Sequence, residues 1–279
     1  MTLGYHIIPC AEENLRDSSI TVLHAKKWLR DYTAFTIYSG AVIAAAAYSV
    51  SHLNYNWQWG RIPGYIISLH DGFKAGPLLQ GVYVTLQISL AGIVFAFILG
   101  LVSALLRLSD SFVAKFIAYC YIEFIRNTPL IVQIFFMYFA VAPIFNISAF
   151  ASAVTALSLF EGAYLSEIMR AGILSIRKGQ WEASLSLGLG RLQTYRYVIL
   201  PQAARRVLPP LTGQGVSLIK DSALVSTISI YDLTMMGQSI VSDTFLSFEI
   251  WFTVALLYLM LTVPLSLFSG YVEKKFNVH

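Results

Sequence analysis

Long stretches without a charged residue dominate the pattern of hydrophobic and polar positions along the chain. Four stretches contain no Asp, Glu, Lys or Arg: residues 34–53, 75–106, 127–160 and 250–272. About 20 helical residues cross the roughly 30 Å hydrocarbon core of a membrane, so each stretch is long enough to span it. The stretches are continuously apolar, whereas strands of a membrane barrel alternate between apolar and polar residues. The pattern therefore predicts an all-α integral membrane protein.

Six membrane-spanning helices are predicted when apolar stretches interrupted by single charges are included. They cover about residues 34–53, 80–106, 118–140, 150–171, 208–230 and 249–271. About 33 residues precede the first span, whose apolar run of 20 exceeds the roughly 7–15 residues of a cleaved signal peptide. We therefore expect an uncleaved N-terminal anchor and a five-helix core, with the segments 1–33 and 54–74 on the two sides of the anchor.

Positively charged residues are distributed unevenly between the two sides that six spans define. Of the 19 Lys and Arg residues, 15 fall on the side of the termini, and only Arg61 and Lys74 fall on the opposite side. The remaining two, Arg126 and Lys220, lie within spans. Because loops rich in Lys and Arg stay in the cytoplasm, both termini are predicted to be cytoplasmic.

The overall composition agrees with a membrane protein and argues against cofactor chemistry. Apolar residues make up 57% of the chain and charged residues 12%, against about a quarter charged in soluble domains. Cys10 and Cys120 lie far apart, and the five His residues are scattered singly, so no disulfide framework or metal site is predicted. The net charge of +4 fits cytoplasmic anchoring better than nucleic-acid binding.

The longest segment between spans follows the fourth of them. Residues 175–208 hold much of the basic charge and are predicted to form two short amphipathic helices separated by glycines. Helix–helix connections typically take roughly 2–8 residues, so this loop is about four times longer than a link requires. Its length favours a functional role in the cytoplasm.

This loop carries a spaced motif. It reads Gly179-Gln180-Trp181-Glu182-Ala183-Ser184-Leu185-Ser186-Leu187-Gly188 and runs on to Val198-Ile199-Leu200-Pro201. The spacing resembles the EAA loop of ABC-importer permeases: Glu-Ala-Ala, three residues, Gly, nine residues, Ile, one residue, Leu-Pro. Ser184 stands for the second Ala and Val198 for Ile, both mild changes. The residues implied to couple the chain to an ATPase are Gly179, Gln180, Glu182, Ala183, Ser184, Gly188, Leu200 and Pro201.

Four further stretches resemble the polar amino-acid branch of the same family, which serves histidine, glutamine, glutamate and arginine. They are residues 121–133, 163–172, 200–210 and 218–226. Together the resemblance covers about residues 75–275, which it identifies as an ABC transmembrane permease domain. The first span lies outside it.

The resemblance implies a non-enzymatic permease subunit in the bacterial inner membrane, with the 54–74 loop in the periplasm. The implied partners are ABC ATPase subunits, a second permease subunit (identical or homologous), a periplasmic substrate-binding protein and membrane lipid. No G-x-x-x-x-G-K-[ST] loop occurs in the sequence, so ATP is expected to be bound and used by the partner ATPase.

Local chemistry makes further predictions for the motif. Small residues at Ala183, Ser184 and Gly188 would allow close helix approach, and Glu182 is expected near a helix start, where its charge complements the dipole. Pro201 and the pair 209–210 are expected to interrupt the helix before the fifth span, because proline disfavours a continuous helix.

Charged residues within the spans are candidates for the translocation pathway, because a charge at a helix centre costs roughly 2.5–3.5 kcal/mol on insertion scales. Glu161 lies near the middle of the fourth span, three residues before Tyr164. It could hold the ammonium group of an amino acid, or it could pair with Lys220. The candidate pathway residues are Glu161, Tyr164, Glu123, Arg126, Thr128, Lys220 and Asp221.

Some of these residues have both structural and functional interpretations. Glu123 and Arg126 are spaced for an i,i+3 contact and serve either as a gate or as a structural pair, while residues 127–129 are expected to kink the helix. The pair 220–221 marks either an unwound, cavity-lining stretch or a structural pair.

Two more patterns predict packing contacts rather than a site. Glu167 and Arg170 are expected to pair locally. Small residues recur every four positions in the second span, which favours close helix packing in lipid. They are Gly92, Ala96, Gly100 and Ala104.

Other classes of membrane protein fit the sequence less well. An intramembrane enzyme needs a catalytic dyad, but Lys220 and Asp221 are adjacent and point to different helix faces, and the core spans contain no His. A sensor or assembly protein would be expected to append a soluble domain. A secondary transporter would need more spans and an internal repeat.

Overall fold

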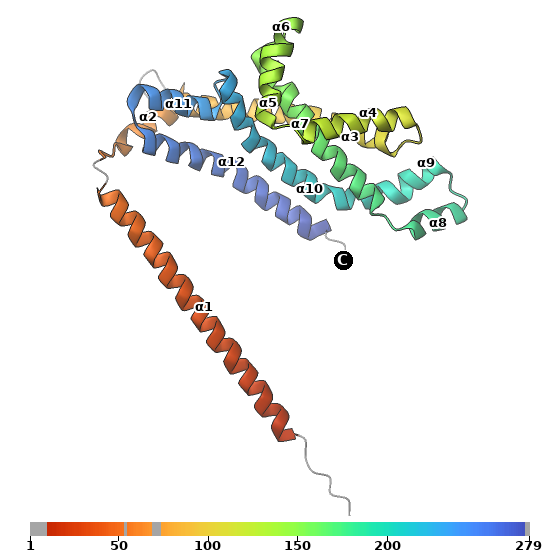
Figure 1. Ribbon diagram of the computed structural model, residues 1–279, viewed down its shortest axis with the longest axis horizontal. Coiled ribbons are helices and arrows are strands. Elements are labelled where there is room, and N and C mark those ends of the chain that lie inside the picture. Colours follow the sequence, from red (N-terminus) through yellow and green to blue (C-terminus); the bar gives the residue numbers. More distant parts are fainter. Residues whose placement is uncertain (1–9, 53–54, 69–73, 277–279) are drawn as a thin grey trace, which may run out of the picture. The chain divides into compact units, whose positions relative to one another are not determined.

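The computed structural model describes residues 10–52, 55–68 and 74–276, which form two compact units, Met1–Trp57 and Gln58–His279. The first unit contains one long helix, α1 (Cys10–His52), which includes all but the last residue of the predicted anchor (Figure 1). Large apolar side chains along this helix are exposed, among them Phe35, Tyr38, Val42 and Ile43. Residues 1–9 of the predicted cytoplasmic segment lie outside the described residues.

The second unit begins at Gln58, within the predicted 54–74 loop, and the described part of that loop in this unit is folded. It contains the 3-10 turn η1 (Trp59–Arg61), the short helix α2 (Ile62–Ile66) and the strands β1 (Ile67–Ser68) and β2 (Lys74–Ala75), paired antiparallel. This two-strand ladder is the one departure from the predicted all-α fold among the described residues. Residues 53–54 and 69–73 of the predicted loop lie outside them.

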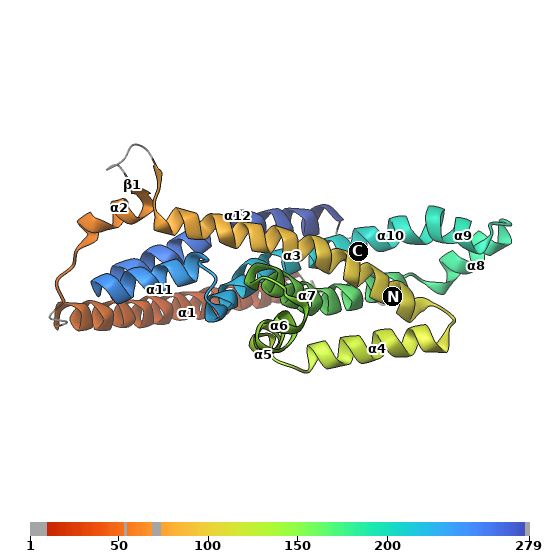
Figure 2. The ribbon, with the colours of Figure 1, turned by 90° about the horizontal axis from the view of Figure 1, so that it is seen from above.

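The centre of the unit is a pair of long helices, α3 (Pro77–Leu108) and α7 (Ala149–Leu174). They run parallel: a Cβ added at Gly92 would lie 3.9 Å from the Leu157 side chain, and one added at Gly100 would lie 2.8 Å from that of Leu165. This approach confirms the packing role predicted for the small residues of α3, all of which are buried. Figure 2 shows the two helices crossing in the middle of the unit.

The predicted third span is broken as the sequence indicates. Helix α4 (Phe112–Arg126) is followed by α5 (Leu130–Phe135), the π-helical η2 (Phe136–Val141) and α6 (Ala142–Phe145), and the chain bends by 107° between residues 126 and 130. Pro129 adopts an extended conformation with φ −62° and ψ 138°, and it has no N–H to continue the helical ladder. The expected kink at residues 127–129 is confirmed.

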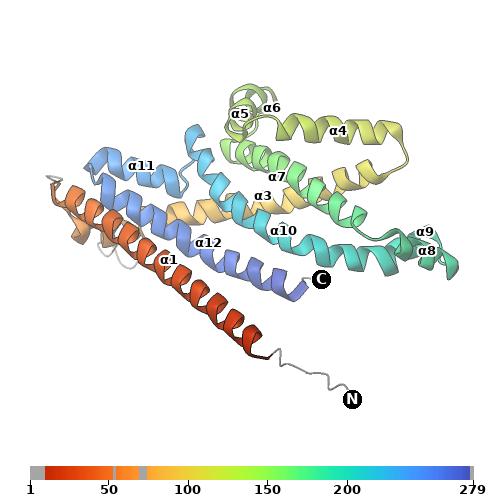
Figure 3. The same cartoon turned by 60° about the horizontal axis from the view of Figure 1, so that its bottom comes forward.

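The long loop after α7 contains α8 (Lys178–Ser186) and then an unbroken helical stretch. Helix α9 (Arg191–Thr194), the π-helical η3 (Tyr195–Ile199) and α10 (Leu200–Asp221) follow one another without interruption. Figure 3 shows α10 running back along the bundle from the α8–α9 end. The fifth helix therefore starts well before the predicted residue 208.

The prediction that prolines interrupt this helix is wrong. Pro201 is the second residue of α10 and directly follows the π-helical η3, and Pro209 and Pro210 lie inside the helix, so the helical stretch continues through all three prolines. A proline frees the carbonyl four residues earlier, which here belongs to Arg205 and Arg206. Both residues are exposed, so solvent or a partner can satisfy these carbonyl groups.

The α-helix does end at Asp221, as the pair 220–221 suggested. The 3-10 stretch η4 (Ser222–Ile228) follows it, and α11 (Leu233–Thr244) and α12 (Ser247–Phe276) complete the chain. The stretch beyond the pair is a 3-10 helix, which is wound more tightly than an α-helix, and its cavity-lining role stays a prediction.

Three helices of the described chain are long and apolar enough to cross a membrane: α3, α7 and α12. The bent segment of residues 112–145 makes a fourth if it counts as one span. These agree with the predicted spans at 80–106, 118–140, 150–171 and 249–271. The total of six spans remains a prediction.

Candidate functional site

The first candidate site is the loop formed by α8 and α9. Helix α8 ends in a Schellman motif: the N–H of Gly188 donates to the carbonyl of Leu185 at 2.9 Å, and that of Leu189 donates to the carbonyl of Ser184 at 3.2 Å. Gly188 has φ +77°, a left-handed conformation that glycine adopts without strain. The glycine of the motif therefore sets the turn between the two helices.

Ser184 holds the two helices of the loop together. Its side chain is buried, and its hydroxyl lies 3.1 Å from the Thr194 hydroxyl of α9. The Trp181 ring packs edge-on against Tyr195, with 4.9 Å between ring centroids. Ser184 is packed within the loop, whereas Ala183 is exposed and the added Cβ at Gly188 would meet nothing within 4 Å. The predicted close approach of these small residues to a partner helix stays a prediction.

The outer surface of the loop is apolar as well as charged. Leu187 and Leu192 are each 81% exposed, and Leu185 is 54% exposed. Glu182 is exposed in the middle of α8 and not in its first turn, so the predicted dipole interaction is wrong. Exposed leucines around a carboxylate, on a loop whose two helices contact each other, are typical of a surface that docks a protein partner.

The remaining motif residues connect the loop to α10. The Gln202 side chain donates to the Gln180 side chain at 3.1 Å, which joins α8 to the start of α10. Leu200 is 47% exposed, and Pro201 and Gly179 are also exposed. Two residues of the motif, Gln180 and Ser184, therefore make contacts that hold the loop together, and the other motif residues are exposed to solvent.

The second candidate site surrounds Glu161, which is fully buried in the middle of α7. Its Oε2 accepts a hydrogen bond from Nε2 of Gln214 on α10 at 2.6 Å. Its Oε1 accepts no hydrogen bond from the described residues, and the Asp221 carboxyl lies close enough to interact with it. Lys220 is exposed and forms no ion pair among the described residues, so the suggested pairing with Glu161 is wrong.

Gln214 is a site residue that the sequence interpretation missed. Gln214 and Asp221 are seven residues apart on α10, which places them on one helix face two turns apart. That spacing is the signal that could have revealed a polar face directed at α7.

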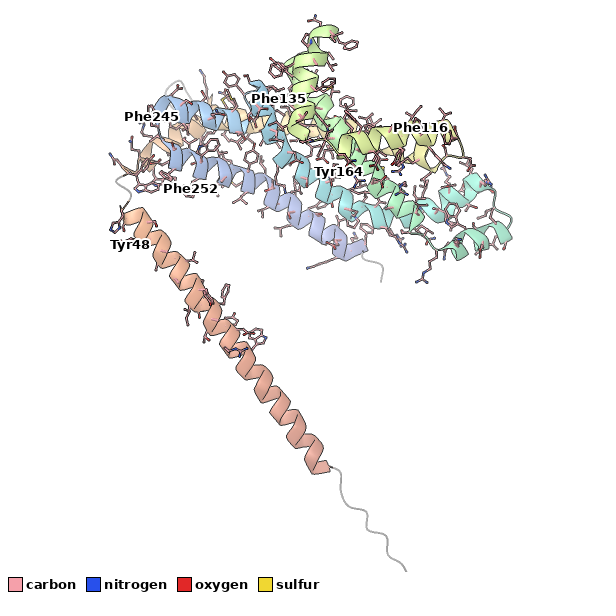
Figure 4. All side chains as sticks on the ribbon, in the orientation of Figure 1. Tyr48, Phe116, Phe135, Tyr164, Phe245 and Phe252 are labelled. Carbon is pink, nitrogen blue, oxygen red and sulfur yellow. The ribbon has the colours of Figure 1, made fainter. Side chains whose placement is uncertain are left out.

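The residues around the break after α4 form another group. Glu123 accepts a hydrogen bond from the Asn127 side chain at 3.1 Å and makes no ion pair with Arg126 within the described chain, so the predicted pair is wrong. Instead, the Arg126 guanidinium lies 5.4 Å from the centroid of the Tyr164 ring on α7. Figure 4 shows Tyr164 in this part of the bundle. A cation over an aromatic face links the two helices.

Thr128 lies within the break and takes part in its capping. Its hydroxyl lies 2.9 Å from the Phe124 carbonyl and accepts a hydrogen bond from Nε2 of Gln133 at 2.8 Å. Of the candidate pathway residues, α7 carries both Glu161 and Tyr164, one turn apart, while Lys220 lies on the surface.

A helical bundle with long apolar helices, an exposed two-helix loop and a buried carboxylate in its centre fits the membrane subunit of a transporter. The chain belongs to the family described as "Binding-protein-dependent transport system inner membrane component", which matches residues 92–278. The chain is therefore a multi-pass inner-membrane component of a transport system and not an enzyme, as the apolar stretches and the family resemblance predicted.

Individual relatives are similar over most of their length. The glutamine transport system permease protein GlnP of Escherichia coli K12 is 42% identical over 204 residues, which cover 72% of this chain and 93% of the relative. The L-cystine transport system permease protein TcyB of Bacillus subtilis is 39% identical over 207 residues, 72% of this chain and 87% of the relative. The crystal structure of an amino acid ABC transporter with histidines superposes with a TM-score of 0.67 at 36% identity, over 71% of this chain and 94% of that one.

Proposed function

We propose that the chain is the permease subunit of an ATP-driven importer that carries a polar amino acid across the inner membrane. The observation that carries this proposal is the relation to a glutamine permease over 93% of its length. The second relative transports L-cystine, so the shared substrate chemistry is an α-amino acid with a polar side chain.

The α8–α9 loop is the proposed docking site for the ATPase. Its exposed leucines and the Glu182 carboxylate provide a docking surface, and the hydrogen bond between Ser184 and Thr194 holds the two helices of that surface together. ATP is bound and used by the partner ATPase, and this chain itself binds no cofactor. The other proposed partners are a periplasmic substrate-binding protein, a second permease subunit (identical or homologous) and lipid along the exposed apolar sides of α3 and α12.

The buried carboxylate of Glu161 is the proposed contact for the substrate ammonium group. An oxygen without a donor, in a low-dielectric interior, attracts a cation strongly once a pathway opens beside it. Arg126 with Tyr164 and the Asp221 carboxyl are the neighbouring polar groups proposed to line the same pathway.

Transport can be tested with purified components in liposomes. The full chain, reconstituted with its ATPase and substrate-binding protein, should take up labelled glutamine or another polar amino acid only when ATP is present. Labelled leucine serves as the control substrate. Uptake that continues without ATP or without the binding protein would contradict the proposal.

The proposed orientation puts both termini and the 175–208 loop in the cytoplasm. In a variant without Cys10 and Cys120, a cysteine introduced by Gly190→Cys should react with a membrane-impermeant maleimide only after the cells are opened. A cysteine introduced by Gly60→Cys, on the proposed periplasmic side, should react in intact cells and serves as the control. Labelling of residue 190 in intact cells would show that the orientation is reversed.

A further inference from the structure

A basic groove of about 530 Å³ lies where the ends of α3 and α7 meet the start of α4. Arg107, Arg170 and Lys115 line it. Among the described residues, the carboxylate that pairs with these cations is that of Glu167, which contacts Arg107 and, at 3.0 Å, Arg170, as the sequence predicted for Arg170. One carboxylate between two guanidinium groups leaves excess positive charge, to which Lys115 adds another.

The other wall of the groove is aromatic. Phe112 is 80% exposed, Phe116 is 57% exposed, and the two rings stack with 6.2 Å between centroids. The Tyr119 ring, 51% exposed, lies 5.8 Å from the Arg107 guanidinium. Figure 4 shows Phe116 projecting from α4. The groove therefore places three cationic side chains next to an apolar surface that nothing in the described chain covers.

The position of the groove indicates which kind of ligand it binds. Arg107 stands in the last turn of α3, a helix long and apolar enough to cross the membrane, so the groove lies at the level of the lipid headgroups. Basic pockets between spanning helices on the cytoplasmic side bind acidic headgroups. A free phosphate ion would match the cations but would leave the exposed Phe pair without a contact, whereas an acyl chain covers it.

We propose that this groove binds an anionic phospholipid, with its phosphodiester group against Lys115, Arg107 and Arg170 and an acyl chain along Phe112 and Phe116. The proposal goes beyond the transport function and does not depend on which amino acid is carried. Lys115 makes no ion pair among the described residues, so it is the cation most available to a headgroup.

Native mass spectrometry of the full chain, purified together with its ATPase, tests the proposal with phosphatidylglycerol and with zwitterionic phosphatidylcholine as probes. We expect phosphatidylglycerol to bind more tightly. Lys115→Gln should weaken that binding about fivefold, because one Lys near an anionic lipid surface contributes about 1 kcal/mol to binding. Lys115→Arg keeps the positive charge and should retain the binding. The matched control is Lys274→Gln, an exposed Lys at the end of α12, which should bind like the wild type.

Three results would overturn the proposal. The first is equal binding of the two lipids to the wild-type protein. The second is unchanged phosphatidylglycerol binding in Lys115→Gln. The third is loss of the ATPase from Lys115→Gln with lipid binding intact, which would assign the groove to the partner protein. Because the readout is lipid binding, failure here leaves the uptake test of the transport function unaffected.

Discussion

The Glu161→Gln variant should take up the proposed amino acid at least about tenfold more slowly than the wild type, with a normal amount of protein in the membrane. The substitution keeps the side-chain volume and the hydrogen bond from Gln214 but removes the negative charge. A hydrogen bond to a charged group contributes about 1.5–3 kcal/mol, which corresponds to about tenfold or more. Uptake into proteoliposomes and thermal unfolding in detergent would measure the two effects separately.

Two companion variants separate a transport role from a structural one. Gln214→Leu leaves the buried carboxylate without its donor, and removing one partner of a buried polar pair is strongly destabilising. Gln214→Leu should therefore unfold at a lower temperature under either role, and the roles differ in uptake: a purely structural Glu161 predicts that Glu161→Gln transports normally. Glu273→Gln, an exposed carboxylate on α12, is the control and should behave like the wild type. Normal uptake by Glu161→Gln would rule out the pathway role.

Gly188→Val should detach the ATPase from the permease. The left-handed conformation at φ +77° costs a residue with a Cβ about 1–3 kcal/mol, and a β-branched residue is the least tolerant. If the loop must hold this turn to dock, association should weaken about tenfold or more. Co-purification of the ATPase with the permease would measure the loss.

Gly188→Asn is the matched control for the turn. Asn enters the left-handed region far more readily than Val, and the space around the added Cβ is open, so this variant should keep most of the association. If both variants lose the ATPase equally, the glycine serves to make room for the partner and not to set the turn. If both keep it, the loop conformation is not needed for docking.

The sequence predicted the membrane helices well because their signal is compositional. Long apolar runs place α3, α7 and α12 within a few residues of the predicted limits, and small residues at every fourth position indicate the packed face of α3. The break at Pro129 was also predictable, because a missing N–H and a restricted neighbour act locally. These features depend on residues close together in the chain.

The pairings failed because they depend on which helix faces meet. Lys220 was the obvious opposite charge for Glu161, but Gln214, 53 positions away in sequence, faces it instead. The i,i+3 rule suggested that Glu123 pairs with Arg126, yet the helix ends at Arg126, and the side chain of Asn127, the next residue, donates a hydrogen bond to Glu123 instead. Local rules assume a continuous helix with no competitor, and neither assumption held at these positions.

The prolines of α10 also show that a local sequence rule fails where the surroundings of the residue decide the outcome. Their cost in a helix depends on whether the freed carbonyl groups reach a donor, which propensity alone does not specify. The carbonyl groups of Arg205 and Arg206 belong to exposed residues, so the helix passes through Pro209 and Pro210.

The uninterrupted helical stretch from Arg191 to Asp221 also restricts how the length of this chain can change during evolution. Each inserted or deleted residue turns everything beyond it by about 100° and shifts it by about 1.5 Å. A single insertion between Pro201 and Gln214 would therefore turn the amide away from Glu161, and a two-turn insertion would restore the angle but move the amide by about 10 Å. Segments such as residues 109–111 and 175–177, which lie between helices, can absorb a change in length. The number of residues between the α8–α9 loop and Gln214, the donor to the buried carboxylate, cannot vary.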